Sequence, residues 1–513
     1  MCSVAGISCG SKSDVSKMLN AMKHRSPDDM GIYHDKDLSL GMGRLSIIDL
    51  KSKNLCPYEN SRVVLSFNGE IYNYKDLRKD LQSQGYKFKT NSDTEVLAIA
   101  WEKWGIRVFN KLKGMFSFAI YEKKTKNLYL ARDIAGEKPL YYTFKNNNIF
   151  FSSEVKALTK ILRFKKQNNK FFKTFQHCLK ETLWKNVYQL QPATYLKFNV
   201  KTKKKNIFEY WQIKRRKIQS KTINEEFEEL LKKSINLTTQ ADVDYGLYFS
   251  KGVDSSLLAA MHNFKKKFYF NDHLNYKKDF LKNIRKIAYH LDFPVGSFSS
   301  YPLWCLAKKA KENNVKVILS GEGADEVFAG YSRYMPFYLQ WKLDNKFPSY
   351  KNLFNKVQFS YIEGYTNLTK RNNDYIDYLN DFMKKLLNSY FEIFDDPVTS
   401  ISYFDFKIIM PSLLQMGDRM SSAFGIENRC PFLDKDIIEF GFNLDIDQKI
   451  NFLNQKIIFK KLLKKKNYKF KNFEKKGLTI KYNKWFDIKG WDRSSYFNLL
   501  VKNWKSAYNI NNS

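Results

Sequence analysis

The sequence predicts an α+β domain of packed sheets with a few helices, followed by an α/β domain with a parallel sheet and a mostly helical C-terminal part. Two patterns lead to this fold class. Short β-rich runs bounded by Gly, Asn and Asp recur through residues 1–210. Further along, apolar strand-like runs alternate with helical patterns, which is typical of a parallel sheet. With 513 residues, the chain is long enough for two or three domains.

The first domain is expected to combine strands with two helices. The strands are predicted at residues 63–69, 128–133 and 148–154. Leu77 and Leu81 lie at helical spacing within residues 74–84, and residues 93–104 form a second helical pattern. A glycine follows each pattern directly, as is common where a helix ends.

A basic stretch at residues 212–221 is the candidate linker. Thr222 and Glu225 then form a capping-box signature that is expected to open the second domain with a helix. The expected elements after it are a strand at 246–249, a helix from Ser255, a strand at 267–271, helices near 277–291 and 302–313, and a strand at 315–319. The rest of the chain, to about residue 510, is expected to be mostly helical.

The charge balance is strongly basic, because 88 Lys and Arg residues face 52 Asp and Glu residues, giving a formal net charge of +36 at pH 7. Such an excess suggests anionic partners. Lys, Asn, Phe, Tyr and Ile are all frequent together, however, and a uniform codon bias produces this pattern. We therefore favour compositional bias over a selected nucleic-acid or membrane-surface patch, and we expect no nucleic-acid partner.

The sequence also bears on location and redox chemistry. No run reaches the ~18 apolar residues of a membrane helix. The N-terminus lacks the basic and then apolar regions of a signal peptide, so we expect a cytoplasmic protein without a membrane partner. The six cysteines show no CxxC spacing, which argues against a zinc site or a disulfide framework.

A lysine-rich stretch stands out near the C-terminus. Residues 456–476 hold ten lysines and one glutamate, with apolar residues at helical spacing between them. We favour a solvated amphipathic helix, and an electrostatic contact with phosphate or nucleic acid is the alternative.

Cys2 is the candidate nucleophile of the first domain. It follows the initiator Met, and a residue as small as Cys normally allows that Met to be removed. The thiol would then lie beside its own α-amine, which titrates near pH ~8 and can accept the thiol proton.

Cys2 belongs to an ordered set of motifs. They are MCSVAGI at the N-terminus, HRSPDD (24–29), GRLSIIDL (43–50), FNGEIYN (67–73), SDTEV (92–96), GMFSFAIYE (114–122), ARDIAGEKPLYY (131–142) and SSEVKAL (152–158). This set resembles the glutaminase domain of class II, N-terminal-nucleophile amidotransferases. The resemblance implies an αββα sandwich over residues 1–210.

The same resemblance implies roles for five further residues. Cys2 would attack the amide of glutamine, while the Asn68 side chain and the Gly69 backbone N–H form the oxyanion hole. Arg44 would clamp the glutamine carboxylate through two parallel hydrogen bonds, and Asp93 would pair with its ammonium, with Glu70 nearby.

Two loops of the second domain have the composition of a phosphate site. Residues 250–256 (SKGVDSS) lie between an apolar strand and a helix, where backbone N–H groups and hydroxyls form an anion cradle. Residues 320–326 (SGEGADE) also follow a predicted strand, so the two loops would meet at one edge of the sheet. Asp254 and Asp325 could then share a Mg²⁺ ion that bridges triphosphate oxygens.

These loops resemble those of the glutamine-hydrolysing asparagine synthetases, as do residues 418–435, 454–463 and 475–486. The resemblance implies that Glu322 acts as acid and base in the amidation step and that Lys456 neutralises phosphate charge. Phe270 would contribute to the adenine wall. The full implied ATP site is Ser250, Gly252, Asp254, Ser255, Ser256, Phe270, Ser320 and Gly321.

The second domain departs from this family pattern at three places, of which the least is Leu478, where a Phe is usual. Lys251 stands where the family has the first loop glycine; if that position requires positive φ, a non-glycine residue costs ~1–2 kcal/mol. Lys251 could instead add a cation to the phosphate cradle. Between Asn271 and Lys277 there is almost no chain, so one βα unit of the family is missing there.

We therefore predict a two-domain ligase, with a glutaminase domain at 1–210 and an asparagine synthetase domain at 222–510. It would use ATP and Mg²⁺, take ammonia from glutamine and amidate aspartate through an acyl-adenylate, with the ammonia kept inside the protein. A homodimer is compatible with this assignment. The alternatives are amidation of another carboxylate, such as that of a surface-polysaccharide sugar, and a glutaminase-only protein with a degenerate ATP site and a basic binding surface.

Overall fold

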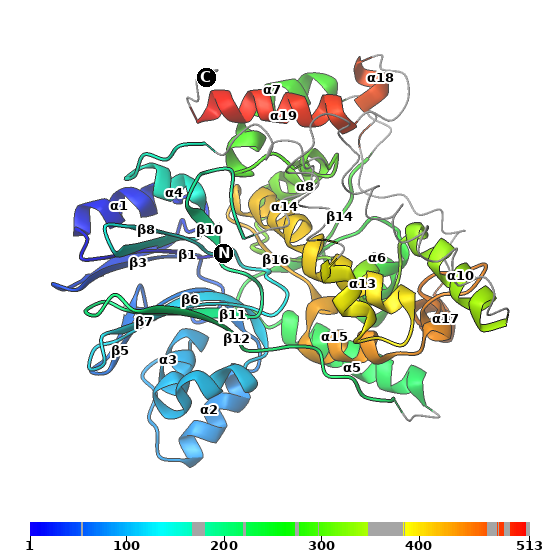
Figure 1. Ribbon diagram of the computed structural model, residues 1–513, viewed down its shortest axis with the longest axis horizontal. Helices are drawn as coiled ribbons and strands as arrows, with labels where there is room; N and C mark the ends of the chain where they lie inside the picture. The colour runs from blue at the N-terminus through cyan, green and yellow to red at the C-terminus, as the bar shows by residue number, and fades with distance from the viewer. Residues whose placement is uncertain are drawn as a thin grey trace.

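The computed structural model describes residues 1–52, 55–166, 180–218, 222–271, 276–295, 297–346, 383, 385–468, 480, 482–486 and 493–508. Two stacked layers of strands lie on one side of the molecule, and a helix-rich region lies on the other (Figure 1). The N-terminus lies between these two regions. Among the residues just given, no helix is long and apolar enough to cross a membrane.

The N-terminal region contains two antiparallel sheets of six strands each. The first has the order β10-β8-β9-β1-β3-β2, with bounds β1 Ser3–Ser8, β2 Asp29–His34, β3 Leu38–Arg44, β8 Tyr141–Lys145, β9 Asn148–Ser152 and β10 Val187–Gln189. The second has the order β12-β11-β7-β6-β5-β4, with bounds β4 Tyr58–Glu59, β5 Val63–Ile71, β6 Gly114–Glu122, β7 Asn127–Arg132, β11 Thr194–Asn199 and β12 Lys205–Glu209.

Helices cover the outer faces of both sheets. Helices α1 (Lys12–Ala21) and α4 (Val155–Thr159) lie on the first sheet, and α2 (Tyr74–Ser83) and α3 (Asp93–Trp104) lie on the second, where the 3-10 helix η1 (Gly105–Asn110) follows α3 (Figure 1). In β5, Val64 packs between the sheets while Leu65 and Phe67 belong to the cluster that also contains Leu97 of α3. This alternation follows from the two-residue period of a strand. The predicted αββα sandwich is confirmed.

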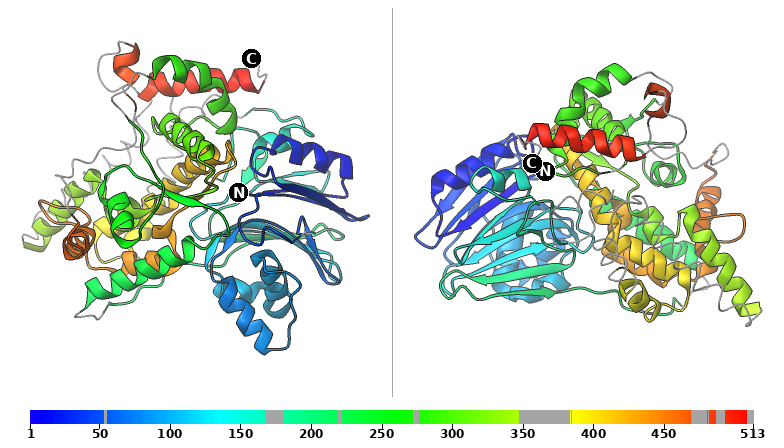
Figure 2. Two further views of the ribbon diagram at one scale, coloured as in Figure 1. Left: turned by 180° about the vertical axis from the view of Figure 1, so that it is seen from behind. Right: turned by 45° about the horizontal axis from the view of Figure 1, so that its top comes forward.

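The C-terminal region is built on a parallel sheet with the order β14-β13-β15-β16. Its strands are β13 Tyr245–Tyr248, β14 Lys267–Phe268, β15 Val317–Leu319 and β16 Glu427–Arg429. The helices are α5 Ile223–Thr238, α6 Val253–Met261, α7 Lys277–His290, α8 Ser300–Glu312, α9 Ala324–Val327, α10 Met335–Lys346, α13 Pro397–Ile408, α14 Met410–Ser422, α15 Lys435–Asn443, α16 Ile446–Lys449, α17 Ile457–Lys465, α18 Tyr482–Phe486 and α19 Arg493–Ala507, with 3-10 helices η3 Ser332–Tyr334 and η5 Pro431–Leu433. The C-terminal helix α19 lies along α7 (Figure 2).

Most elements expected from the sequence are present. The parallel sheet and the helices predicted at 74–84, 93–104, 277–291 and 302–313 are confirmed. The strand expected at 267–271 is shorter, because β14 ends at Phe268. Thr222 does precede α5, but its side chain accepts no capping hydrogen bond, so the expected capping box is not formed.

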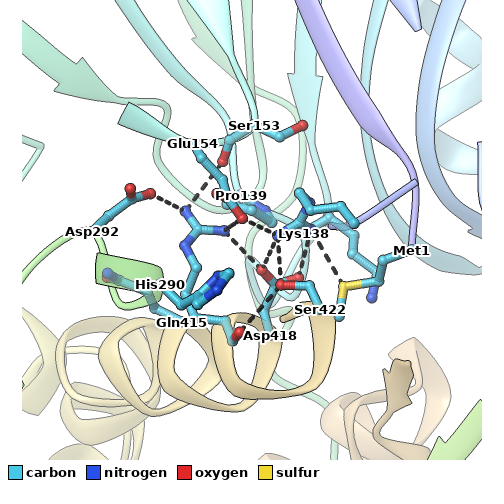
Figure 3. Close-up of polar contacts among 12 residues, drawn as sticks. Met1, Lys138, Pro139, Ser153, Glu154, His290, Asp292, Gln415, Asp418 and Ser422 are labelled. Carbon is cyan, nitrogen blue, oxygen red and sulfur yellow. Dashed lines mark hydrogen bonds and ion pairs between the residues drawn. The ribbon is translucent and has the colours of Figure 1, made fainter. Parts of the chain in front are cut away.

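A buried ionic network joins the two regions (Figure 3). The Arg25 guanidinium lies 2.8 Å from Glu154 and 2.7 Å from Asp418 of α14. Arg419 lies 3.0 Å from Asp292 and 2.8 Å from Asp418. All five side chains are at most 4% exposed. Charges buried this deeply are costly unless they are paired with good geometry, so separating the two regions would leave several of these charges without their partners.

Candidate active sites

Cys2 lies at the start of β1, between the two sheets and the C-terminal region. It is 9% exposed, and its backbone N–H donates to Oδ1 of Asn68 at 3.1 Å. The Cys2 carbonyl accepts from Nε of Arg25 at 3.2 Å, and its thiol points to the carbonyl of Leu45 at 4.0 Å. Burial raises the pKa of the Cys2 thiol to about 11, so the thiol needs a base to become a nucleophile.

Of the two oxyanion donors predicted from the sequence, Asn68 contacts Cys2 directly and Gly69 follows it on the same strand. Asn68 is on β5 and is fully buried, and its amide nitrogen lies 3.5 Å from the Ser117 hydroxyl. Gly69 follows it with φ +152, and a Cβ there would lie 2.1 Å from the carbonyl oxygen of Met115. Only glycine therefore fits beside strand β6 at this point.

Arg44 and Asp93, which are expected to hold glutamine, are both buried. Arg44 donates to the carbonyls of Ser52, Ile48 and Asp49, which uses three of its five N–H groups and shapes the loop after β3. Asp93 begins α3 and accepts from the Ile71 N–H at 2.9 Å. Burial raises the pKa of Asp93 to about 6 despite that hydrogen bond, so the site favours a cationic partner for this carboxylate.

Glu70 faces the C-terminal region. One of its carboxylate oxygens lies 3.3 Å from the Arg429 guanidinium of β16, and its other oxygen is buried without a hydrogen bond. Burial raises the pKa of Glu70 well above its ordinary value. Its pairing links the Cys2 site to the parallel sheet.

Strand β16 contacts both candidate sites. Glu427 lies 3.6 Å from the Met1 amine and Arg429 pairs with Glu70, both on the side of Cys2. Asn428, between them, donates from its amide to Glu322 at 3.1 Å on the other side. Successive side chains of a strand point to opposite faces, so these three consecutive residues contact both sites.

The second site is a cavity of about 490 Å³ at the carboxyl ends of the parallel strands. Seven of the eight residues predicted for ATP line it: Ser250, Gly252, Asp254, Ser255, Phe270, Ser320 and Gly321. The eighth, Ser256, is buried in the first turn of α6 and does not line the cavity. In the first loop, the Ser250 and Gly252 N–H groups donate to the hydroxyls of Ser255 and Ser250.

Lys251 adopts φ +61, so it occupies the left-handed region that glycine prefers. Its side chain is exposed and points toward the Tyr269 ring, 5.9 Å away, and it does not line the cavity. Lys251 thus adopts the left-handed backbone conformation expected of glycine at this position, at a steric cost of ~1–2 kcal/mol.

Lys456 joins the two loops. Its ammonium lies 2.5 Å from Asp254 and 2.6 Å from Asp325, the two carboxylates predicted to bind Mg²⁺. A Cβ on Gly330 would lie 2.0 Å from both the Asp325 carboxylate and the Lys456 side chain, so glycine leaves the space for this contact. Carboxylate oxygens converging on one cation are the hard ligands that suit Mg²⁺ beside phosphate.

Glu322 lines the cavity close to β16 and is half-buried. It accepts from the Asn428 amide at 3.1 Å and from the Cys430 thiol at 3.6 Å. Burial raises the pKa of Glu322 to about 7, while these two hydrogen bonds act in the opposite direction. A carboxyl group with a pKa near neutrality suits proton transfer in either direction.

Sequence reasoning missed several residues of the second site. Asn428 and Cys430 lie in and just after β16, a strand too short to show an apolar run. Arg333 lines the cavity and lies 2.7 Å from Asp405 of α13, and neither lies in a loop that follows a predicted strand. Asn428 and Cys430 do lie within residues 418–435, a segment that matches the family pattern, although the resemblance gives neither residue a role.

Two family models match this chain, and together they define the class of protein to which it belongs. Residues 1–211 match the family model described as glutamine amidotransferase domain, so the class is that of chains in which such a domain precedes an α/β domain. Residues 226–268 and 271–486, about half of the chain, match the family model described as asparagine synthase. The chain belongs to the asparagine synthase family.

Three curated relatives show the level of similarity. Asparagine synthetase [glutamine-hydrolyzing] 1 of Bacillus subtilis is 32% identical over 63% of this chain and 56% of its own length. Asparagine synthetase [glutamine-hydrolyzing] 2 of the same organism is 27% identical over 87% of this chain and 66% of its own length. A putative asparagine synthetase 2 of Methanocaldococcus jannaschii is 29% identical over 64% and 74%. The matched region thus spans little more than half of the first relative.

Proposed function

We propose that the chain is an ATP-dependent, glutamine-hydrolysing amidotransferase that converts aspartate to asparagine. Its glutaminase domain would comprise residues 1–210 and its synthetase domain residues 222–510. The observation that carries the proposal is strand β16, whose Glu427 and Arg429 reach the Cys2 side while Asn428 reaches Glu322. The names of the curated relatives support the same activity.

The first half-reaction starts with removal of Met1. Met1 is fully buried between the two regions, where its amine faces Glu427, so removal would precede docking of the domains. The freed Cys2 amine then takes the thiol proton. The thiolate attacks the glutamine amide carbon, Asn68 and Gly69 stabilise the oxyanion, and the C–N bond breaks to release ammonia and leave a thioester that water hydrolyses.

The second half-reaction uses the cavity at the parallel sheet. An aspartate carboxylate oxygen attacks the α-phosphorus of ATP, and pyrophosphate leaves toward Lys456 and the loop at 250–256. Asp254 and Asp325 would hold Mg²⁺, which neutralises phosphate charge when bound. Ammonia then attacks the acyl carbon of the adenylate, AMP leaves, and Glu322 accepts the proton that the new amide loses.

Ammonia would pass between the sites along β16. Removal of Met1 opens buried space beside Glu427, one residue from Asn428. A route closed to water matters because ammonia that gains a proton is no longer a nucleophile. Lys138 of the first domain lies 3.4 Å from the Asn428 carbonyl and places a cation along this route.

The test compares Cys2→Ala with the unaltered protein, in the presence of Mg-ATP and aspartate. Glutamate, asparagine and pyrophosphate are measured with glutamine and, separately, with ammonium chloride. We expect Cys2→Ala to lose glutamine-dependent synthesis by at least a thousandfold and to keep ammonia-dependent synthesis. Equal loss of both activities would contradict the role of Cys2. Glutamate without aspartate-dependent pyrophosphate would contradict the synthetase.

A further inference from the structure

Three lysines form a stripe along helix α17. Lys456 caps its N-terminus, and Lys460 and Lys464 follow at intervals of four residues, which places them on one face. Their exposure increases along the stripe, because Lys456 is buried, Lys460 is half-buried and Lys464 is exposed. The stripe therefore leads from the candidate ATP cavity to the surface. Helix α17 lies on the side of the molecule away from the two antiparallel sheets (Figures 1 and 2).

A second cavity of about 490 Å³ opens along this stripe. We call it the outer cavity. Among the described residues that line it, none is acidic: they are Asn451, Asn454, Ile457, Lys460, Lys461, Lys464, Asn467 and Tyr468. Lys460 also lines the candidate ATP cavity, so one side chain is shared by both.

The cations of the outer cavity are paired with neutral groups. Lys460 donates to the amide oxygen of Asn454 at 2.7 Å, and Lys461 donates to that of Gln448 at 2.8 Å. Burial lowers the pKa of Lys460, and no carboxylate in the described part of the chain opposes this shift. Glu228 pairs with Lys465 and Lys466, which do not line the outer cavity. The uncompensated positive charge thus faces the outer cavity, where an anion would stabilise it.

We propose that the outer cavity binds inorganic pyrophosphate after it leaves the candidate ATP cavity, through Lys460, Lys461 and Lys464. The inference rests on the proposed function, which releases pyrophosphate beside Lys456. When pyrophosphate leaves the candidate ATP cavity, it loses its contacts with the two loops and with Lys456. Other cations must replace those contacts. Lysine suits this exchange because its point charge sits on a flexible stem and follows a moving anion.

The size and position of the outer cavity favour pyrophosphate over nucleic acid. A nucleic-acid surface needs several cations spread along a backbone. Here Lys460, Lys461 and Lys464 surround one cavity, and Lys460 connects it to the site where pyrophosphate would form.

The test is calorimetric titration of the full-length protein with sodium pyrophosphate, with and without a saturating non-hydrolysable ATP analogue. With the analogue bound, we expect one pyrophosphate per chain to bind at the outer cavity. Replacing two lysines that do not line the ATP cavity, in K461Q/K464Q, should weaken this binding by about tenfold. The matched control K309Q/K311Q removes the same charge from the exposed end of α8 and should leave it unchanged.

Three outcomes would overturn the proposal. The first is loss of all pyrophosphate binding when the analogue is bound. The second is equal weakening in K461Q/K464Q and in the control. The third is tighter binding of a short oligonucleotide, displaced by salt and dependent on the same lysines. Without the analogue, K461Q/K464Q must still bind pyrophosphate more weakly than the control, so this test stands even if the protein makes no asparagine.

Discussion

At the scale of single residues, Asn428 is expected to set the pH range of the synthetase through Glu322. Its amide hydrogen bond stabilises the ionised carboxylate and opposes the effect of burial on the pKa of about 7. Asn428→Ala removes that bond, so the pKa of Glu322 should rise. Since Glu322 must be ionised to accept a proton, the acid limb of ammonia-dependent synthesis should move to higher pH by about one unit, which corresponds to ~1.4 kcal/mol.

The control for this prediction is Cys430→Ser. The serine hydroxyl keeps a donor toward Glu322, so its pH profile should stay close to that of the unaltered protein. A fall in rate at every pH without a moved limb would show that Asn428→Ala acts through packing alone. Glutamine hydrolysis without aspartate should keep its pH profile in both variants.

The candidate residues differ in how far the sequence could predict them. Cys2, Asn68 and Asp254 stand in contiguous motifs, and the strand or helix beside each motif fixes where the side chain goes. Glu70 was predicted near glutamine, and the structure pairs it with Arg429, more than three hundred residues away. No local pattern carries a contact of that kind, because it exists only once the two regions dock.

At the scale of elements, segments with an apolar pattern were predictable, including the short strands β13 and β15, and a short segment without such a pattern was not. Helix α3 was predicted with its observed bounds, because its apolar residues and its terminal glycine agree. Strand β16 has three residues, all buried, and they read Glu-Asn-Arg. A strand with this composition is stabilised by tertiary ion pairs rather than by an apolar pattern, so periodicity could not reveal it.

The buried network at α14 gives a prediction about stability. Glu154→Gln removes one carboxylate from the Arg25 and Arg419 guanidinium groups, which lie 2.8 Å and 3.5 Å from it. Both cations stay fully buried, and breaking a buried pair in this way costs about 3–5 kcal/mol. The free energy of unfolding from urea titration should fall by about 3 kcal/mol. Glu312→Gln, which breaks an exposed pair with Lys308, should cost less than about 1 kcal/mol.

We expect a loss at the lower end of the range of about 3–5 kcal/mol because Asp418 still pairs with both arginines after Glu154 is replaced. If Glu154→Gln and Glu312→Gln lowered the free energy of unfolding by the same amount, the network would contribute no more to stability than a surface ion pair.

At the scale of the whole molecule, two buried histidines at the contact between the two regions give a prediction about pH. His24 of the first region and His290 at the end of α7 meet edge to face, with ring centroids 4.5 Å apart. Burial lowers the pKa of both, and the carboxylate of Glu154 opposes the effect at His24. A state in which the regions separate exposes both rings and returns their pKa to about 6.5.

Separation would therefore take up protons at the two rings as the pH falls below about 6.5, so their contribution to docking should weaken in that range. Glu70 beside Arg429 acts in the opposite direction, because burial raises its pKa in the docked state. Glu154 and Asp418 do not contribute there, because their pKa values are lowered below the ordinary carboxyl range. Asparagine formed per glutamine hydrolysed should accordingly fall more steeply between pH 7 and pH 5.5 than protonation of Glu322 alone requires, while glutamine hydrolysis itself continues. In His24→Gln/His290→Gln both sites are neutral at every pH, so this ratio should vary less. A ratio that falls equally in both proteins, or in neither, would mean that the histidines do not control docking.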